Sequence, residues 1–239
     1  MTHNHLIFNR IRVRSHRDHA AATFAHSDFL FRECAVRLAD RLPDINRTFP
    51  MALDLGAHNG LLAEYMRGLN GIEHVVQADV SRTMITQAKG LRVVADEEFL
   101  PFAPASFDLV LSVFSLHWIN DLPGTLIQIN RILKPGGLLM MMVPGGETLK
   151  ELRQSFEQAE LAETGGMSPR ISPFVDARAG GSLLQRAGFT LPVADSEIVT
   201  IHYENPMKLL DDLHACGETN ALMTSHKGFF AAWGFVWGD

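Results

Sequence analysis

The sequence predicts an α/β fold in which a mostly parallel sheet carries helices on both faces. From about residue 50, short apolar runs alternate with segments of helical periodicity, the pattern of β-α-β units. Residues 107–113 (FDLVLSV) are apolar almost without a break, as a strand buried on both faces is. A glycine-containing turn at residues 54–60 (DLGAHNG) joins the first strand of this region to its first helix.

The individual elements follow from periodicity and from start and stop signals. Strands are expected at residues 51–55, 74–78, 92–95, 107–113 and 138–143, and an edge strand at 197–203. Helices are expected at residues 61–69, 81–89, 122–133, 147–162 and 182–187. Ser81 is a suitable N-cap for the second of these helices, and residues 134–137 (KPGG) are a stop signal.

A further helix is expected before the first strand. Ser27 or Asp28 can cap it, and its apolar residues lie on one face. These residues are Phe31, Cys34, Ala35, Leu38 and Leu42. We therefore expect residues 1–48 to form a helical lid and residues 49–239 to form the main domain.

The composition fits a single buried core in a reducing compartment. The 239-residue chain is 46% hydrophobic, which excludes global disorder. Cys34 and Cys216 are too few for a disulfide framework and lack the spacing of metal ligands. No apolar run reaches the ~18 residues of a membrane span, and no signal-peptide core is seen. We expect a cytoplasmic protein without a metal site, or a mitochondrial matrix protein if the source is eukaryotic.

Charge is distributed unevenly along the chain. Residues 1–50 carry 8 basic and 5 acidic side chains, whereas the remainder carries 13 basic and 22 acidic ones. The acidic body argues against nucleic-acid binding, which requires a basic face. The basic start contains Arg10, Arg12, Arg14 and Arg17. It is interpreted as a solvated arm, with an acidic partner or a transit-like segment as the alternatives.

The glycine turn indicates a ligand site at the carboxyl ends of the strands, where open α/β sheets bind their ligands. A dinucleotide-binding turn would have glycine at positions 56, 58 and 61, but His58 and Leu61 occupy two of these positions. This departure counts against a nicotinamide or flavin enzyme. An ordinary turn between a strand and a helix is the alternative for the motif taken alone.

Acidic residues end the next two strands. Asp79 ends the second strand, where a carboxylate can accept hydrogen bonds from both hydroxyls of a ribose. Asp96 and Glu97 end the third strand, where a carboxylate can accept from an exocyclic adenine amine. Residues 112–116, beginning with Ser112, would form the floor beside a reacting group. A single carboxylate of this kind is more often a helix cap, but the ordered set favours a nucleoside-containing cofactor.

These motifs resemble the class I S-adenosylmethionine-dependent methyltransferases. The matching stretches are ALDLGAHNG, QAD, ADEEFLPFAPASFDLVLSVFSLHWINDLP and LKPGG. From about residue 8 to 220 the chain is most similar to the family of the mitochondrial complex I assembly factor 5 and its bacterial relatives. Residues 95–123, 145–160 and 165–174 carry that closer likeness. A more distant resemblance is to the biotin-pathway O-methyltransferase that esterifies a malonyl-carrier protein.

The resemblance implies a Rossmann-like, seven-stranded type of sheet, and S-adenosylmethionine as cofactor with S-adenosylhomocysteine as product. It implies a protein substrate, a complex I subunit, whose arginine the family is credited with hydroxylating. The implied cofactor-binding residues are Asp54, Gly56, Ala57, His58, Gly60, Asp79, Val80, Met84, Asp96, Glu97 and Ser112. Residues 145–160 and 165–174 are expected at the mouth of the site, with Arg153, Ser168, Arg170 and Ser172 facing a substrate.

Two positions depart from the family pattern. His58 stands where relatives have glycine, and histidine is among the side chains that tolerate a positive φ. Residues 228–239 (GFFAAWGFVWGD) replace a longer carboxyl end, so we expect a shortened or altered last strand.

The chemistry stays open between several interpretations. His117 follows the fourth strand and is the candidate general base, with a hydrogen-bonded wall residue as the alternative. Hydroxylation would call for an oxidant or a metal, yet no set of two histidines and a carboxylate has the required spacing. We therefore weigh a protein-modifying enzyme, a carrier-protein or small-molecule O-methyltransferase, and a non-catalytic assembly factor with a structural cofactor.

Overall fold

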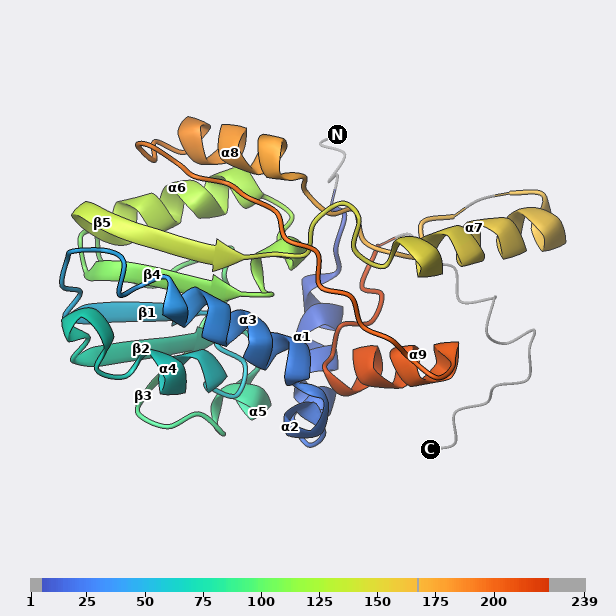
Figure 1. Ribbon diagram of the computed structural model, residues 1–239, viewed down its shortest axis with the longest axis horizontal. Helices are drawn as coiled ribbons and strands as arrows, with labels where there is room; N and C mark the ends of the chain where they lie inside the picture. Colours follow the sequence, from blue (N-terminus) through green and yellow to red (C-terminus); the bar gives the residue numbers. More distant parts are fainter. Residues whose placement is uncertain (1–5, 167, 224–239) are drawn as a thin grey trace.

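The computed structural model describes residues 6–166 and 168–223 and has a parallel five-stranded sheet at its centre (Figure 1). The strands are β1 (Met51–Leu55), β2 (His74–Asp79), β3 (Leu91–Val94), β4 (Phe107–Val113) and β5 (Leu133–Met142). Their order is β3-β2-β1-β4-β5, and every pairing is parallel. The strand order reverses between β1 and β4, which places the expected ligand crevice above their carboxyl ends.

Helices cover both faces of the sheet, and a third group lies at its carboxyl edge (Figure 1). One face packs against α6 (Leu122–Ile132) and α8 (Ala177–Arg186), and the other against α3 (Phe29–Asp40) and α4 (Leu61–Met66). The carboxyl edge carries α1 (Arg10–Ala20), α2 (Phe24–Ser27) and α9 (Pro206–Ala215). The short α5 (Arg82–Ile85) follows β2, and α7 (Lys150–Thr164) extends away from the sheet.

The central strands alternate their side chains between two apolar clusters. Leu53 and Val110 belong to the cluster under α6 and α8, while Ala52 and Leu109 belong to the cluster under α3 and α4. Both sides of β1 and β4 are therefore buried, which explains the unbroken apolar run in β4. The apolar face expected for residues 31–42 is buried as well, and it forms the inner face of α3.

The α/β class and the strands from residue 51 to 113 are confirmed, with changes at some element ends. The helix after Ser81 ends at Ile85 instead of residue 89, although the Ser81 hydroxyl caps it as expected, accepting from the Met84 amide. The fifth strand begins at Leu133, before the KPGG segment, and its pairing with β4 is irregular between Phe107 and Leu109.

The edge strand expected at residues 197–203 is wrong, because this segment forms no strand. Its alternating apolar residues remain in solvent, with Ile198 85% exposed, so the alternation has no buried face to match. The described residues consequently form five strands of the expected seven-stranded type. The aromatic tail at residues 228–239 lies outside the described residues.

The amino-terminal segment is not a solvated arm. Asn9 caps α1 by accepting from the Arg12 amide, and Phe8 forms an antiparallel bridge with Leu222. These contacts join both ends of the described chain at the carboxyl edge of the sheet. Over the described ranges, no helix is long and apolar enough to cross a membrane.

Candidate functional site

The turn after β1 needs glycine for steric reasons. Gly56 and Gly60 have φ of 73° and 87°, a region that disfavours other residues. A Cβ on Gly56 would lie 2.1 Å from the Ser115 Cβ, and one on Gly60 would lie 2.4 Å from the Gln77 Oε1. The turn therefore holds its backbone closely against the ends of β2 and β4.

His58 occupies the centre of this turn with φ of 51°, the conformation for which histidine is tolerated. Its amide donates to the Asp79 Oδ2 at 3.0 Å. The buried ring is stacked on Phe24 and meets Phe31 edge-on, with centroid distances of 5.3 and 4.9 Å. Burial and then the nearby Arg17 charge lower the pKa of His58, so its ring is neutral at pH 7.

The acidic residues that end β2 and β3 do meet, but they hold a guanidinium of the same chain. Arg17 of α1 is 1% exposed and donates to the Asp79 Oδ2 at 3.0 Å and to the Glu97 Oε1 at 2.9 Å. It also donates to the Ser115 hydroxyl at 2.9 Å, and that hydroxyl donates to Glu97 at 2.5 Å. Arg17 thus lies where a ribose was expected.

Arg10, seven residues earlier on the same face of α1, pairs with the acidic residues that follow β3. Its guanidinium donates to the Asp96 Oδ1 at 2.6 Å and also binds Glu97. Burial by itself would raise the pKa of Glu97, but the charges of Arg17 and Arg10 keep that pKa below its usual value. Glu97 is consequently an ionised carboxylate between two arginines.

Asp54 is the one acidic member of the expected set that lacks a cation. It is 1% exposed, and its Oδ2 has no hydrogen-bond partner. Burial, with a smaller contribution from the negative charge of Asp79, raises the pKa of Asp54 to about 8. A neutral carboxyl group therefore lies under the glycine turn at neutral pH.

The remaining expected ligands are packed into the protein. The Ser112 hydroxyl donates to the Leu55 carbonyl at 2.7 Å, and Val80, Met84 and Ala57 are buried. The cavity beside the glycine turn has a volume of about 10 Å³. Small-molecule sites usually measure about 300–1,000 Å³. The residue types and their positions suit a nucleoside cofactor, whereas this cavity is too small to hold one.

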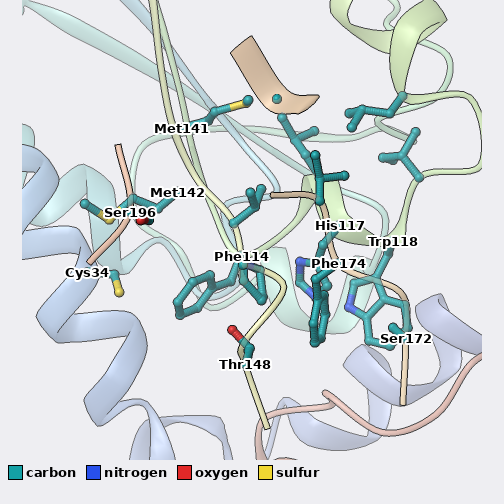
Figure 2. A pocket seen from close by; sticks show the side chains of 18 of the residues that line it. Cys34, Phe114, His117, Trp118, Met141, Met142, Thr148, Ser172, Phe174 and Ser196 are labelled. Carbon is teal, nitrogen blue, oxygen red and sulfur yellow. The ribbon is translucent and has the colours of Figure 1, made fainter. Parts of the chain in front are cut away.

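A large open groove of about 2460 Å³ lies elsewhere, along β5 and the segments that follow it. Figure 2 shows part of this groove, with Met141 and Met142 at one end and His117, Trp118 and Phe174 at the other. Arg170 lines it but pairs with Glu160 at 2.8 Å, and Arg153 binds the carbonyls of Gly146 and Thr148. These contacts agree with a loop-closing role for both arginines.

His117 lies in the wall of the groove, as a candidate base should. Its Nε2 lies 2.9 Å from the Glu218 Oε2, and the Trp118 indole donates to the same oxygen at 3.0 Å. Glu218 follows α9, about 100 residues away in sequence. No local pattern in the sequence points to this contact.

Sequence reasoning also missed Arg10 and Arg17 as parts of the site. The sequence did contain a signal for this pairing. Arg10 and Arg17 are seven residues apart, so they lie on the same face of a helix, and the strand ends carry acidic residues that could bind them. In the part of the chain that the structure describes, no group of three histidine, cysteine or acidic side chains could hold a metal ion.

Comparison with known proteins identifies the fold and the family. Residues 53–141 match the family described as a methyltransferase domain. A Haloferax volcanii putative methyltransferase, solved in complex with the Trm112 activator, superposes with a TM-score of 0.56. The identity is 23%, over 72% of this chain and 75% of that one. Haemonchus contortus phosphoethanolamine N-methyltransferase 2, solved with S-adenosyl-L-methionine, gives a TM-score of 0.52 at 21% identity. That match covers 66% of this chain and 36% of the other.

Fold and motif match together define a class I methyltransferase domain. Among named relatives, the mitochondrial arginine-hydroxylase NDUFAF5 of Danio rerio is 41% identical over 90% of this chain and 68% of its own length. The Homo sapiens protein is 44% identical over 81% of this chain and 57% of its own length. The malonyl-[acyl-carrier protein] O-methyltransferase of Methylovorus sp. is 35% identical over 95% of this chain and 80% of its own length. The chain belongs to the family of S-adenosylmethionine-dependent methyltransferase-like enzymes that contains these proteins. It spans 57–68% of the length of the two arginine hydroxylases.

Proposed function

We propose that this chain binds S-adenosylmethionine at the carboxyl edge of the sheet and modifies a protein substrate that enters through the β5 groove. The observation that carries the proposal is the acidic edge itself. Asp79 and Glu97 are buried beside a sterically constrained glycine turn and hold a guanidinium in the place of a ligand. A buried pair of carboxylates requires hydrogen-bond donors, and ribose hydroxyls and an adenine amine supply them.

Each residue has a defined part in this proposal. Gly56 and Ala57 bring backbone close to the cofactor, Asp79 accepts from the ribose, and Asp96 accepts from the adenine amine. The neutral rings of His58, Phe24 and Phe31 form an apolar wall beside it. When bound, the cofactor supplies an activated methyl group. His117 lies in the groove wall and takes a proton from the substrate.

Arg17 must leave the acidic edge before a cofactor can occupy it. Asp79 and Glu97 then exchange the Arg17 guanidinium for the hydrogen-bond donors of the cofactor, so neither carboxylate is left buried without a partner. The protein would thus remain folded with or without its cofactor. Asp79 and Glu97 have the same function in both states, which is to accept hydrogen bonds.

The relatives favour a protein substrate, and we place it in respiratory complex I assembly because of the likeness to arginine-hydroxylase NDUFAF5. The test is mass spectrometry of complex I subunits from cells with and without this protein. A gain of one oxygen on an arginine supports hydroxylation, and a gain of a methyl group supports transfer. Unmodified subunits with normal assembly would contradict this placement.

A carrier-protein O-methyltransferase is the second candidate. It is favoured by the larger share of the relatives' length that this chain covers, 80% for the Methylovorus protein. The purified protein would then transfer labelled methyl to a malonyl-carrier protein, and the label would be released by mild base as for an ester. Complex I defects without any modification would instead support an assembly factor whose cofactor is structural.

A further inference from the structure

Glu218 is held in place by the end of α9. Gly217 has φ of 76° and closes the helix, with its amide donating to the His214 carbonyl at 3.0 Å. A Cβ at Gly217 would lie 3.1 Å from the His16 carbonyl oxygen of α1, so the two helices pack closely at this position. The Glu218 amide then donates to the Leu213 carbonyl at 2.8 Å. This turn directs the Glu218 side chain towards residues 116–118.

The carboxylate of Glu218 accepts two hydrogen bonds with one oxygen. His117 Nε2 and the Trp118 indole nitrogen lie 2.9 and 3.0 Å from the Oε2. An ionised carboxylate only accepts, and the indole only donates. The Nε2 of His117 must therefore carry a proton, so that in the neutral form of the ring Nδ1 is the acceptor nitrogen.

That acceptor has no partner within the protein. The His117 side chain is 4% exposed, and its Nδ1 is buried without a hydrogen bond. Figure 2 shows the ring beside Phe174 and Trp118 in the wall of the groove. Phe174 meets it at a centroid distance of 6.1 Å, and its ring carries no acceptor or donor that could satisfy the nitrogen. A buried acceptor without a donor is rare in folded proteins, and it marks a place where a ligand can donate.

Several charges act on this pair. Burial by itself would raise the pKa of Glu218, but His117 and then Arg17 bring that pKa below its usual value. His58, from the turn after β1, and His16, from α1, also face the carboxylate. The net direction of these effects on the pKa favours the ionised form of Glu218.

We propose that Glu218 is a positioning residue that holds His117 as its Nε2–H tautomer and so presents Nδ1 to the substrate. This inference rests on the proposed function and deepens it. The substrate has a hydroxyl or amine whose O–H or N–H bond breaks as Nδ1–H forms, and its electron pair stays on the reacting atom. The imidazolium that results faces the Glu218 carboxylate, which stabilises its charge.

Nitrogen-15 NMR of the labelled protein tests the tautomer directly, at a pH where the ring is neutral. His117→Asn identifies the signals of His117 among the 11 histidines. We expect the Nε2–H form in the wild-type protein and a mixture of tautomers in Glu218→Gln, since an amide can either donate or accept. Glu160→Gln is the matched control, because it removes a carboxylate bound to Arg170 and Ser168 and should leave the His117 signals unchanged. An Nε2–H form that persists in Glu218→Gln overturns the proposal.

Kinetics test the consequence for the substrate. Glu218→Gln should lower kcat by about 10²-fold or more, the usual contribution of a positioned base, with KM and cofactor affinity unchanged. The acid limb of its pH–rate profile should shift, a change that a merely structural role would not produce. Should Glu218→Gln fail to fold, Glu218→Asp serves as the second variant, because it draws the carboxylate back by one methylene. Its kcat should also be lower than that of the wild-type protein. Unchanged kcat overturns the positioning role.

The two proposals fail in distinguishable ways. A wild-type protein that shows the Nε2–H form and modifies no substrate overturns the proposed function, while it supports the assigned tautomer. A wild-type protein that modifies its substrate with the Nδ1–H form overturns the role of Glu218, while it supports the proposed function.

Discussion

His58 places a buried ring at the centre of the glycine turn. Its backbone has φ of 51°, which is unfavourable for a side chain, yet its ring packs between two phenylalanines. The ring nitrogens have no hydrogen-bond partner. Strain and packing thus oppose each other at a single residue of the glycine turn.

His58→Gly should bind S-adenosylmethionine as tightly as the wild-type protein or more tightly. Glycine relieves the positive φ and removes a ring from the crowded turn. Titration calorimetry measures the affinity, and His58→Asn, which also tolerates this conformation, is the control. A large loss of affinity would instead show that contacts of the imidazole with the cofactor outweigh the relief of the positive φ.

Asp79→Ala should weaken S-adenosylmethionine binding by at least about tenfold. Hydrogen bonds to a charged acceptor contribute on the order of 1.5–3 kcal/mol, and about 1.4 kcal/mol corresponds to tenfold. Asp108→Ala is the control, because Asp108 pairs with Lys134 away from the glycine turn. Equal affinities of Asp79→Ala and the wild-type protein would place the ribose elsewhere.

Asp54 should make the protein less stable as the pH rises. Its pKa is raised to about 8 in the fold, so the folded state keeps a proton that the unfolded state has lost above about pH 4. The resulting stability is fully present below about pH 4 and decreases by up to about 1.4 kcal/mol per pH unit until the folded pKa is reached. Urea unfolding measures the free energy of unfolding at pH 5 and pH 8. Its decrease between these two pH values should be smaller in Asp54→Asn than in the wild-type protein. An equal decrease in both proteins would mean that Asp54 is ionised in the fold.

At the scale of elements, the central strands could be predicted and the carboxyl-edge contacts could not. Strands β1 and β4 are specified by local apolar runs, because both of their faces are buried. The seven-residue spacing of Arg10 and Arg17 indicates a shared helix face, but it does not identify their partners, since those of Arg17 lie 62 and 80 residues away. The alternation of residues 197–203 indicated an edge strand, but alternation specifies a strand only where one face becomes buried.

Arg17→Gln should destabilise the cofactor-free protein by about 3–5 kcal/mol, the usual effect of removing one partner from a buried ion pair. The increase in melting temperature produced by S-adenosylmethionine should be larger than in the wild-type protein, since ribose hydroxyls restore donors to the unpaired carboxylates. Arg14→Gln, on the exposed side of the same helix, is the control. It should change neither the stability of the cofactor-free protein nor the increase in melting temperature produced by S-adenosylmethionine. A smaller cofactor effect in Arg17→Gln would show that Arg17 assists binding instead of competing with it.

At the scale of the whole molecule, two regions of different character lie side by side. The acidic edge is filled by the buried guanidinium of Arg17, whereas a large groove runs along β5. Over the described ranges, β5 pairs with β4 alone, so its outer edge borders the groove.

S-adenosylmethionine or S-adenosylhomocysteine should raise the melting temperature of the whole protein, and NAD should not. At a concentration 100 times the dissociation constant, binding adds about 2.7 kcal/mol to the free energy of unfolding. The glycine turn with His58 and Leu61 lacks the pattern of a dinucleotide site. A melting-temperature increase with NAD alone would contradict the assigned cofactor.

The burial of Arg17 also has a consequence for rates. On the binding mode proposed above, a cofactor enters only during the intervals in which Arg17 has released the acidic edge, so the open fraction of molecules scales the apparent affinity. The observed rate constant for binding should then level off at high cofactor concentration, at the opening rate of α1. In Arg17→Gln it should continue to rise with concentration. Stopped-flow fluorescence would distinguish a rate constant that levels off from one that continues to rise. The plateau in the wild-type protein would give the lifetime of the closed state.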